Sequence, residues 1–110
     1  VNAGGFIFKK KFLKEVRELC TLYNISLVFD EIQTAFGWLG AMFASDYFQV
    51  KPDIITLGKA LGCGFPLAAA IMKEEYDVMD YGEDEFTYGG HPISCAIALQ
   101  NIQYLQKSNN

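Results

Sequence analysis

Two short apolar runs that each end in a charged residue decide the fold: Leu27-Val28-Phe29-Asp30-Glu31 and Ile54-Ile55-Thr56-Leu57-Gly58-Lys59. A short apolar run that stops abruptly at polar or glycine residues is typical of a buried strand. In open α/β sheets, ligands bind in the crevice beyond the carboxyl ends of the strands. If the two strands are parallel neighbours, the side chains of Asp30 and Lys59 meet in one crevice.

Helical patterns flank these runs on both sides. From Lys9 to Tyr23, apolar residues recur every three or four positions, which predicts an amphipathic helix with its apolar face in the core. Pro92 fits the first turn of a final helix, whose apolar face from Ile93 to Leu105 is also expected in the core. A third strand is expected at 67–72, and short helices at 41–48 and 73–79.

This order of elements predicts an α/β fold: a partial, mostly parallel sheet with helices on both faces. Three strands are few, because the mean sheet has about 5–6. The first residue is Val1 and not Met, and the chain stops directly after its last helical pattern. We therefore expect residues 1–110 to be one part of a larger domain.

Composition narrows the class of protein. The 110 residues are 51% apolar and 20% charged, which is the balance of a soluble globular protein. A net charge of −4 without an extended basic patch argues against nucleic acid as a partner. No apolar run approaches the ~20 residues that span a bilayer. Three cysteines, with no closely spaced pair, favour neither disulfides nor zinc and fit the reducing cytoplasm.

A lysine and an acid at one sheet edge suit a particular chemistry. Desolvation lowers the pKa of a lysine, and its neutral amine can then form a Schiff base with a carbonyl. A nearby carboxylate can hold a positive charge on a bound cofactor, so Asp30 and Lys59 match the needs of pyridoxal phosphate. Two other interpretations stay open. Asp30 and Glu31 can simply end a strand beside a solvated Lys59, or the acids can bind magnesium, although the GxxxxGK[ST] phosphate loop is absent.

Three motifs, in order, resemble those of class III aminotransferases, which are pyridoxal-phosphate enzymes of fold type I. Leu27–Thr34 resembles the family's DEV/IQ motif, and Pro52–Pro66 its Schiff-base lysine segment. Phe86–Pro92 is similar to its downstream TxGGNP segment. The resemblance covers nearly the whole chain and implies a fragment of the large, cofactor-binding domain.

The resemblance also implies roles for five residues. Lys59 would form the Schiff base with pyridoxal 5'-phosphate and then carry a proton as general base and acid. Asp30 would pair with the protonated ring nitrogen, and Gln33 would hydrogen-bond near the 3′-oxygen. Ile32 would pack on a face of the ring. Thr87 would bind the cofactor phosphate of the neighbouring subunit, across a dimer interface. No residue is assigned to a metal.

The implied parent protein is an aminotransferase. It would move an amino group from an amino donor, such as an ω-amino acid or a diamine, to a 2-oxo acid. It would be a homodimer in the cytoplasm, with no membrane contact. The family's upstream phosphate-cradling segment and its C-terminal small domain are missing from residues 1–110, so this piece alone is expected to be inactive. Alternatives are another reaction of the same cofactor (aminomutase, racemase or decarboxylase) or a non-catalytic assembly subunit.

Several residues depart from the family pattern or invite other roles. Where the family often has a glycine and an Arg-Thr pair, this chain has Ala35 and Trp38-Leu39. Removing an arginine removes a fixed charge with five donors, so substrate recognition cannot be carried over. Phe36 and Trp38 are expected to line the substrate entrance or the dimer contact.

The remaining polar and sulfur-containing candidates are interpreted as structural. Glu31 is expected to be a structural acid beside Asp30. His91 stands where the family more often has Asn, which favours a loop or interface role. Cys63 and Cys95 are expected to be small packing residues.

Overall fold

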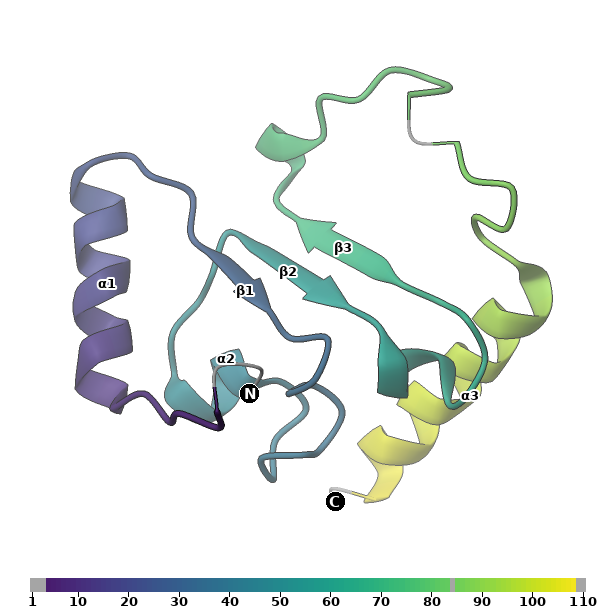
Figure 1. Cartoon of the computed structure of the whole chain (residues 1–110), viewed down its shortest axis with the longest axis horizontal. Coiled ribbons are helices and arrows are strands. Elements are labelled where there is room, and N and C mark those ends of the chain that lie inside the picture. The colour runs from purple at the N-terminus through teal and green to yellow at the C-terminus, as the bar shows by residue number, and fades with distance from the viewer. Residues whose placement is uncertain (1–3, 84, 109–110) are drawn as a thin grey trace.

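The computed structural model describes residues 4–83 and 85–108, which form a three-stranded sheet flanked by two long helices (Figure 1). Helix α1 lies beside β1, and α3 lies on the opposite side of the molecule, next to η1 (Figure 1). The elements in chain order are α1 (Lys10–Leu22), β1 (Val28–Asp30), α2 (Ala44–Phe48), β2 (Ile54–Leu57), the 3₁₀ helix η1 (Lys59–Gly62), β3 (Ala69–Met72), the 3₁₀ helix η2 (Glu74–Tyr76) and α3 (Pro92–Ser108).

The sheet has the order β1-β2-β3 and is mixed. Strands β1 and β2 are parallel, with Val28 opposite Ile54 and Asp30 opposite Thr56. Strand β3 runs antiparallel to β2, with Ile54 opposite Met72. The expected α/β fold is confirmed, and the sheet described here holds one parallel and one antiparallel pair. The carboxyl ends of β1 and β2 consequently lie at the same sheet edge.

Strand β1 begins later than the apolar run predicts. The chain is already apolar at Ile25 and Leu27, but regular pairing starts at Val28. The N–H of Leu27 donates instead to the Asp53 carboxylate, at 2.8 Å. The Leu27 carbonyl accepts from the N–H groups of Asp53 and Ile54, at 2.8 and 3.3 Å. A side chain therefore takes the place of one ladder hydrogen bond at the start of the strand.

A small core lies between the sheet, the loop after β1 and α3. Ala98 of α3 packs there with Leu61 of η1 and Leu57 of β2. Asn101 of α3 donates to the carbonyl of Ala60, at 2.8 Å, and so ties the helix to η1. The buried core residues are Ala35, Phe36, Leu57, Leu61 and Ala98, with Met42, Phe43, Ile55, Ala60, Leu67, Ala69, Ile102 and Leu105 partly buried against them.

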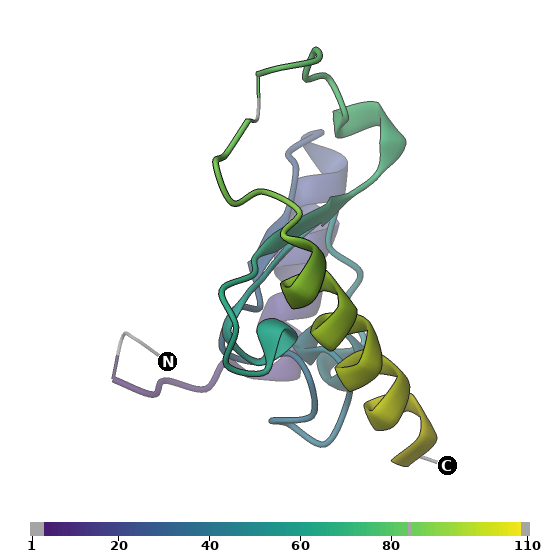
Figure 2. The ribbon, with the colours of Figure 1, turned by 90° about the vertical axis from the view of Figure 1, so that its right-hand side faces the viewer.

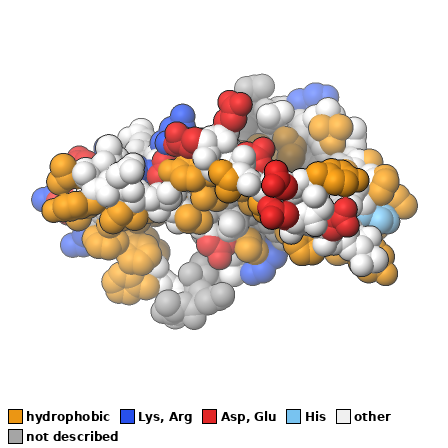
Figure 3. Space-filling view, turned by 90° about the horizontal axis from the view of Figure 1, so that it is seen from above, with side chains coloured by type: hydrophobic (Ala, Val, Ile, Leu, Met, Phe, Trp, Pro, Cys, Tyr) orange, Lys and Arg blue, Asp and Glu red, His pale blue; other side chains and the backbone are white. Residues whose placement is uncertain are grey.

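The prediction that both helix faces are buried is wrong for α1 and only partly met by α3. Helix α1 has no buried residue, and Phe12 and Leu19 are 48% and 54% exposed. Only a stripe of half-buried residues lies on α1, namely Leu13, Val16, Arg17 and Cys20. On the outer part of the apolar face, Phe12 stacks only on Phe8 of the preceding segment, with ring centroids 5.3 Å apart, and both rings stay about half exposed. Hydrophobic side chains are spread over the face seen in Figure 3.

The radius of gyration also indicates that the described residues do not close a complete core. It is 15.4 Å, against roughly 13 Å for a self-contained domain of this length. A chain that closed its own core would be more compact. The expectation of a partial sheet thus agrees with the shape of the described residues. None of their helices is long and apolar enough to cross a membrane.

The prediction of a helix at 73–79 is also wrong. One 3₁₀ turn, Glu74–Tyr76, forms there, and the chain then continues without regular structure (Figure 1). Val78 and Met79 are 80% and 50% exposed, so the described residues give them little to pack against. A short helix without tertiary packing is marginal in water, because nucleation is costly.

Candidate active site

The carboxyl edge of the parallel pair brings together three of the residues predicted from the sequence. Asp30 ends β1, and Lys59 begins η1 directly after β2. The Lys59 Nζ donates to Oε1 of Gln33, at 3.2 Å. The backbone of Lys59 is left-handed, with φ of 44°. This conformation costs a residue other than glycine about 1 kcal/mol or more and is concentrated at functional sites.

The Asp30 carboxylate is held on one side only. Its Oδ1 accepts from the Ile32 N–H at 3.1 Å and from the Thr56 hydroxyl at 3.2 Å. Its Oδ2 has no hydrogen-bond partner among the described residues. One carboxylate oxygen thus remains available to a donor on a ligand. Because a cationic ring N–H is such a donor, the arrangement fits a protonated pyridine nitrogen.

Ile32 flanks the segment that carries Lys59. Its side chain is half-buried, and its Cγ2 lies 3.5 Å from where a Cβ on Gly58 would be. An apolar side chain thus lies beside the backbone that leads into Lys59. This place is compatible with packing on a flat ring, the role the resemblance implies for Ile32.

The chain itself does not desolvate this site. Asp30, Gln33 and Lys59 are all exposed. The burial of Lys59 expected from the sequence is therefore not found, because no described element covers the edge of the sheet. A groove of about 650 Å³ does exist, but it lies between α2 and the sheet, lined among others by Val50 and Met72.

Thr87 does not lie beside the other predicted site residues. It is exposed and lies in the turns that precede α3. That segment, light green in the figures, lies away from η1 in both Figure 1 and Figure 2. Its role toward the phosphate of a second subunit stays a prediction.

Glu31, next to Asp30, has a structural role, as expected. Its side chain is 1% exposed and points to α2. Oε2 accepts from the Ala44 N–H at 2.5 Å, and Oε1 from the Ser45 N–H at 2.8 Å. These two N–H groups begin α2 and have no partner within the helix. The acid therefore fixes the loop after β1 to α2.

Replacing Glu31 by alanine should destabilise the complete protein by about 2–3 kcal/mol, because two buried N–H groups lose a charged acceptor. Chemical denaturation monitored by fluorescence would measure this loss. Glu31→Gln keeps an acceptor oxygen and should cost clearly less. Equal stability of Glu31→Ala and the wild type would contradict the assigned role.

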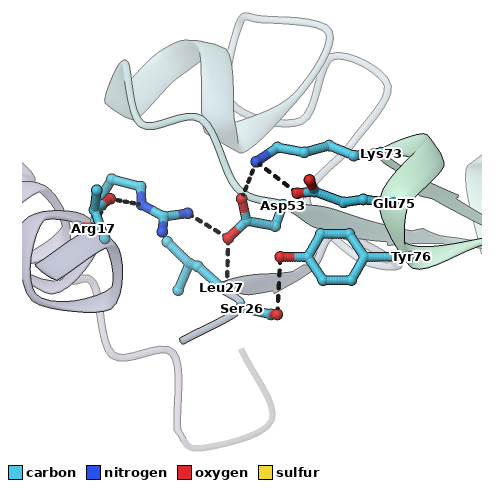
Figure 4. A network of polar contacts seen from close by, with 8 residues as sticks. Arg17, Ser26, Leu27, Asp53, Lys73, Glu75 and Tyr76 are labelled. Atoms are coloured by element: carbon cyan, nitrogen blue, oxygen red, sulfur yellow. Dashed lines mark hydrogen bonds and ion pairs between the residues drawn. The ribbon is translucent and has the colours of Figure 1, made fainter. Parts of the chain in front are cut away.

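A buried carboxylate that the sequence analysis did not single out joins three elements (Figure 4). Asp53 Oδ2 accepts from Arg17 Nη1 of α1 at 2.6 Å, and Oδ1 pairs with Lys73 Nζ, after β3, at 2.7 Å. The side chain of Asp53 is 8% exposed. Hydrogen bonds from the N–H of Leu27, from Lys73 and from Arg17 hold the pKa of Asp53 well below its usual range.

Two neighbouring contacts extend this network. Lys73 also lies 3.6 Å from a Glu75 oxygen, and the Ser26 hydroxyl donates to the Tyr76 hydroxyl at 3.0 Å (Figure 4). The hydrogen bond to Asp53 raises the pKa of Lys73. The sequence carried one signal for the network: an acid placed directly before an apolar strand. Its basic partners are too distant in sequence to be predicted.

Phe36 is a core residue and does not line an entrance. It is 8% exposed and packs edge-on against Phe43, with ring centroids 6.1 Å apart. Its N–H donates to the Met42 carbonyl at 2.6 Å, and the Gly37 N–H donates to the Ala41 carbonyl at 3.1 Å. The loop is thus anchored by its own backbone, without the family's usual arginine. Trp38, at its tip, is 74% exposed.

The expectations for the cysteines and His91 had different outcomes. Cys63 and Cys95 are both exposed, so the prediction that they are packing residues is wrong. Cys63 directly follows η1, and Cys95 lies in the first turns of α3 on a side that no described residue covers. His91 lies at the start of α3, where its Nδ1 accepts from the Ser94 N–H at 3.4 Å. That contact agrees with the loop role expected for His91, and the interface role stays a prediction.

The fold and the site together define an α/β segment that presents an amine, an amide and a carboxylate at the carboxyl edge of a parallel strand pair. Residues 1–110 match the family described as class-III aminotransferases. The acetylornithine aminotransferase of Methanocaldococcus jannaschii is 43% identical over 107 residues, which are 96% of this chain and 27% of that protein. The ornithine aminotransferase of Brevibacillus brevis is 47% identical over 106 residues, 94% of this chain and 27% of that protein.

Solved structures give the same result. An ornithine aminotransferase from Plasmodium yoelii superimposes with a TM-score of 0.90 at 34% identity, over 96% of this chain and 29% of that chain. A thermostable (S)-enantioselective omega-transaminase from Thermomicrobium roseum gives 0.82 at 30% identity, over 93% of this chain and 24% of that chain. The chain belongs to the class III aminotransferase family, whose enzymes have the fold type I architecture and depend on pyridoxal phosphate. It spans little more than a quarter of the length of these curated relatives.

Proposed function

We propose that the complete protein is a pyridoxal-phosphate-dependent aminotransferase, and that residues 1–110 are part of its large domain. Its reaction would move an amino group from an amino donor to a 2-oxo acid. The observation that carries the proposal is the convergence of Asp30, Gln33 and Lys59 at the carboxyl edge of β1 and β2. Membership of the class III family supports it.

Lys59 is the central residue of the proposed chemistry. Its amine lies at the start of η1, on a backbone held in a left-handed conformation. Pyridoxal phosphate, when bound, supplies an electron-poor ring that accepts the electron pair left at a substrate carbon. Lys59 holds the cofactor covalently and afterwards moves a proton at that carbon as general base and acid.

The neighbouring residues orient the ring. Oδ2 of Asp30, which has no partner among the described residues, would accept the ring N–H and keep the positive charge on the ring. Gln33, which accepts from Lys59 at 3.2 Å, can donate its amide N–H groups to the 3′-oxygen. Ile32 packs against the ring face. In this proposal Thr87 binds the phosphate held by a second subunit, so the complete protein is a homodimer.

In this proposal, residues of the complete protein outside 1–110 complete the site. The exposure of Asp30, Gln33 and Lys59 supports a covering contribution from outside residues 1–110. We assign to that region a phosphate-cradling segment and a small domain that binds the substrate carboxylate. The described residues alone are accordingly inactive.

The amino donor proposed is an ω-amino acid or diamine such as ornithine or N-acetylornithine. The support is that several relatives are named ornithine or acetylornithine aminotransferase. The 2-oxo acid is the acceptor. Three free cysteines favour a reducing compartment, and we propose the cytoplasm, although a Drosophila melanogaster relative is named as mitochondrial.

Borohydride trapping tests the proposal directly. The complete protein, mixed with pyridoxal phosphate, should develop a visible absorbance band that borohydride abolishes. Peptide mass spectrometry should then find the reduced cofactor attached to Lys59 and to no other lysine. Attachment elsewhere, or no attachment, contradicts the proposal.

Substrate assays separate the alternatives. Transfer of an amino group from ornithine or N-acetylornithine to added 2-oxoglutarate identifies an aminotransferase. Racemisation, rearrangement or decarboxylation without consumption of the 2-oxo acid identifies another reaction of the same cofactor. A protein that binds no pyridoxal phosphate is an assembly subunit.

A further inference from the structure

Thr56 lies directly opposite Asp30 in the sheet. The two residues are register partners in the parallel strands β1 and β2. Side chains of register partners project from the same face of a sheet and come within contact distance. The Thr56 hydroxyl donates to Asp30 Oδ1 at 3.2 Å.

Thr56 is also the one polar side chain in β2. The other members of the strand are Ile54, Ile55 and Leu57. A valine would have the same shape and the same preference for a strand, so only the hydroxyl distinguishes threonine here. That hydroxyl donates its hydrogen bond to Asp30 Oδ1, and within the described ranges it has no second partner.

The two donors to Asp30 come from different parts of the chain. The Ile32 N–H belongs to the turn after β1, and the Thr56 hydroxyl belongs to the neighbouring strand. Both donate to Oδ1, which leaves Oδ2 free among the described residues. The terminal torsion of an aspartate is broad, so one donor alone leaves the carboxylate loosely oriented. Two donors in different directions fix its plane.

We infer that Thr56 is a positioning residue: it orients the Asp30 carboxylate so that Oδ2 meets the cationic ring of the cofactor. The inference rests on the proposed function, because it acts through the role of Asp30. Nothing in the role of Thr56 requires contact with the cofactor or the substrate.

Thr56→Val and Thr56→Ser in the complete protein form the test. Cofactor-free protein is titrated with pyridoxal phosphate, and absorbance gives Kd. Thr56→Val should bind about tenfold more weakly, the size of one hydrogen bond to a charged acceptor, and Thr56→Ser should match the wild type. The pH midpoint of the absorbance band should shift in Thr56→Val and return in Thr56→Ser. A purely structural role would lower the unfolding temperature and leave both readouts unchanged.

Thr34→Val is the matched control. Its hydroxyl lies 3.4 Å from Oε2 of Glu31, so the same atom is removed beside the neighbouring carboxylate. Kd and the pH midpoint should stay at wild-type values. Thr56→Ala is the second variant should Thr56→Val fold poorly, and it should show the same shift in both readouts.

Asp30→Asn separates failure of the inference from failure of the proposed function. It should weaken cofactor binding more than Thr56→Val does. If Asp30→Asn binds as tightly as the wild type, the proposed role of Asp30 is wrong. If Asp30→Asn binds weakly while Thr56→Val does not, the proposed function stands and the inference about Thr56 is overturned.

Discussion

Replacing Lys59 by alanine should reduce amino transfer by the complete protein by about 10³-fold or more, because general acid and base catalysis alone contributes about 10²–10⁴-fold. The variant loses both the covalent attachment of the cofactor and the group that moves the proton. Steady-state assays with an amino donor and a 2-oxo acid would measure the loss. The absorbance band attributed to the lysine-bound cofactor should disappear as well.

Lys14→Ala is the matched control for this result. Lys14 is an exposed lysine of α1, in an element that contributes nothing to the site edge. Its rate should equal that of the wild type. Full activity in Lys59→Ala would contradict the assignment of Lys59 and the proposed mechanism that depends on it.

The second large effect concerns stability. Asp53→Asn should destabilise the complete protein by about 3 kcal/mol, since removing one charge of a buried pair leaves the other uncompensated. Arg17 is the less exposed of the two cationic partners, at 22% against 49% for Lys73, so water screens its charge less. Urea denaturation at pH 7 would measure the difference.

The same variant predicts a pH dependence with a definite sign. The pKa of Asp53 is lower in the folded protein than in the unfolded chain. Its stabilisation is therefore complete above about pH 5 and is lost as pH falls below the ordinary carboxyl pKa of about 4. The stability gap between wild type and Asp53→Asn should be largest near neutral pH and should shrink between pH 5 and pH 3, where the unfolded wild type takes up the proton.

Glu15→Gln provides the control for both parts of this prediction. Glu15 pairs with Lys11 at 3.7 Å, and both side chains are largely exposed. Exposed pairs of this kind contribute little, so the stability should equal that of the wild type at every pH. A gap between wild type and Asp53→Asn that does not vary with pH would contradict the assigned network.

The comparison of sequence and structure is clearest at particular elements. The helix beginning near Lys10, the strand at Ile54–Leu57 and the helix beginning at Pro92 were all predicted, because each depends on local periodicity, apolar runs or proline geometry. The placement of Asp30 and Lys59 at one end of the sheet was predicted for a topological reason: parallel neighbours share a carboxyl edge. Gln33, which accepts from Lys59, was expected there only from the family resemblance.

The prediction of a helix at 73–79 was wrong, because a local pattern does not supply tertiary packing. Its pattern was local, but Val78 and Met79 stay 80% and 50% exposed among the described residues, so little packing supports a helix there. Phe36 was expected to line the substrate entrance or the dimer contact, but it is a core residue, because a backbone pairing between Phe36 and Met42 turns the ring inward, to Phe43. Both outcomes depend on packing between segments.

The sequence by itself determined which residue types follow the two parallel strands, and from them it predicted the candidate site, because residue types and strand ends depend on local sequence. Only the tertiary structure decided which charges are buried and which apolar faces are covered. Asp53 draws its partners from α1 and from the end of β3, and Lys59 stays exposed because no described element covers it. Burial and long-range pairing depend on how distant segments pack, which no local pattern encodes.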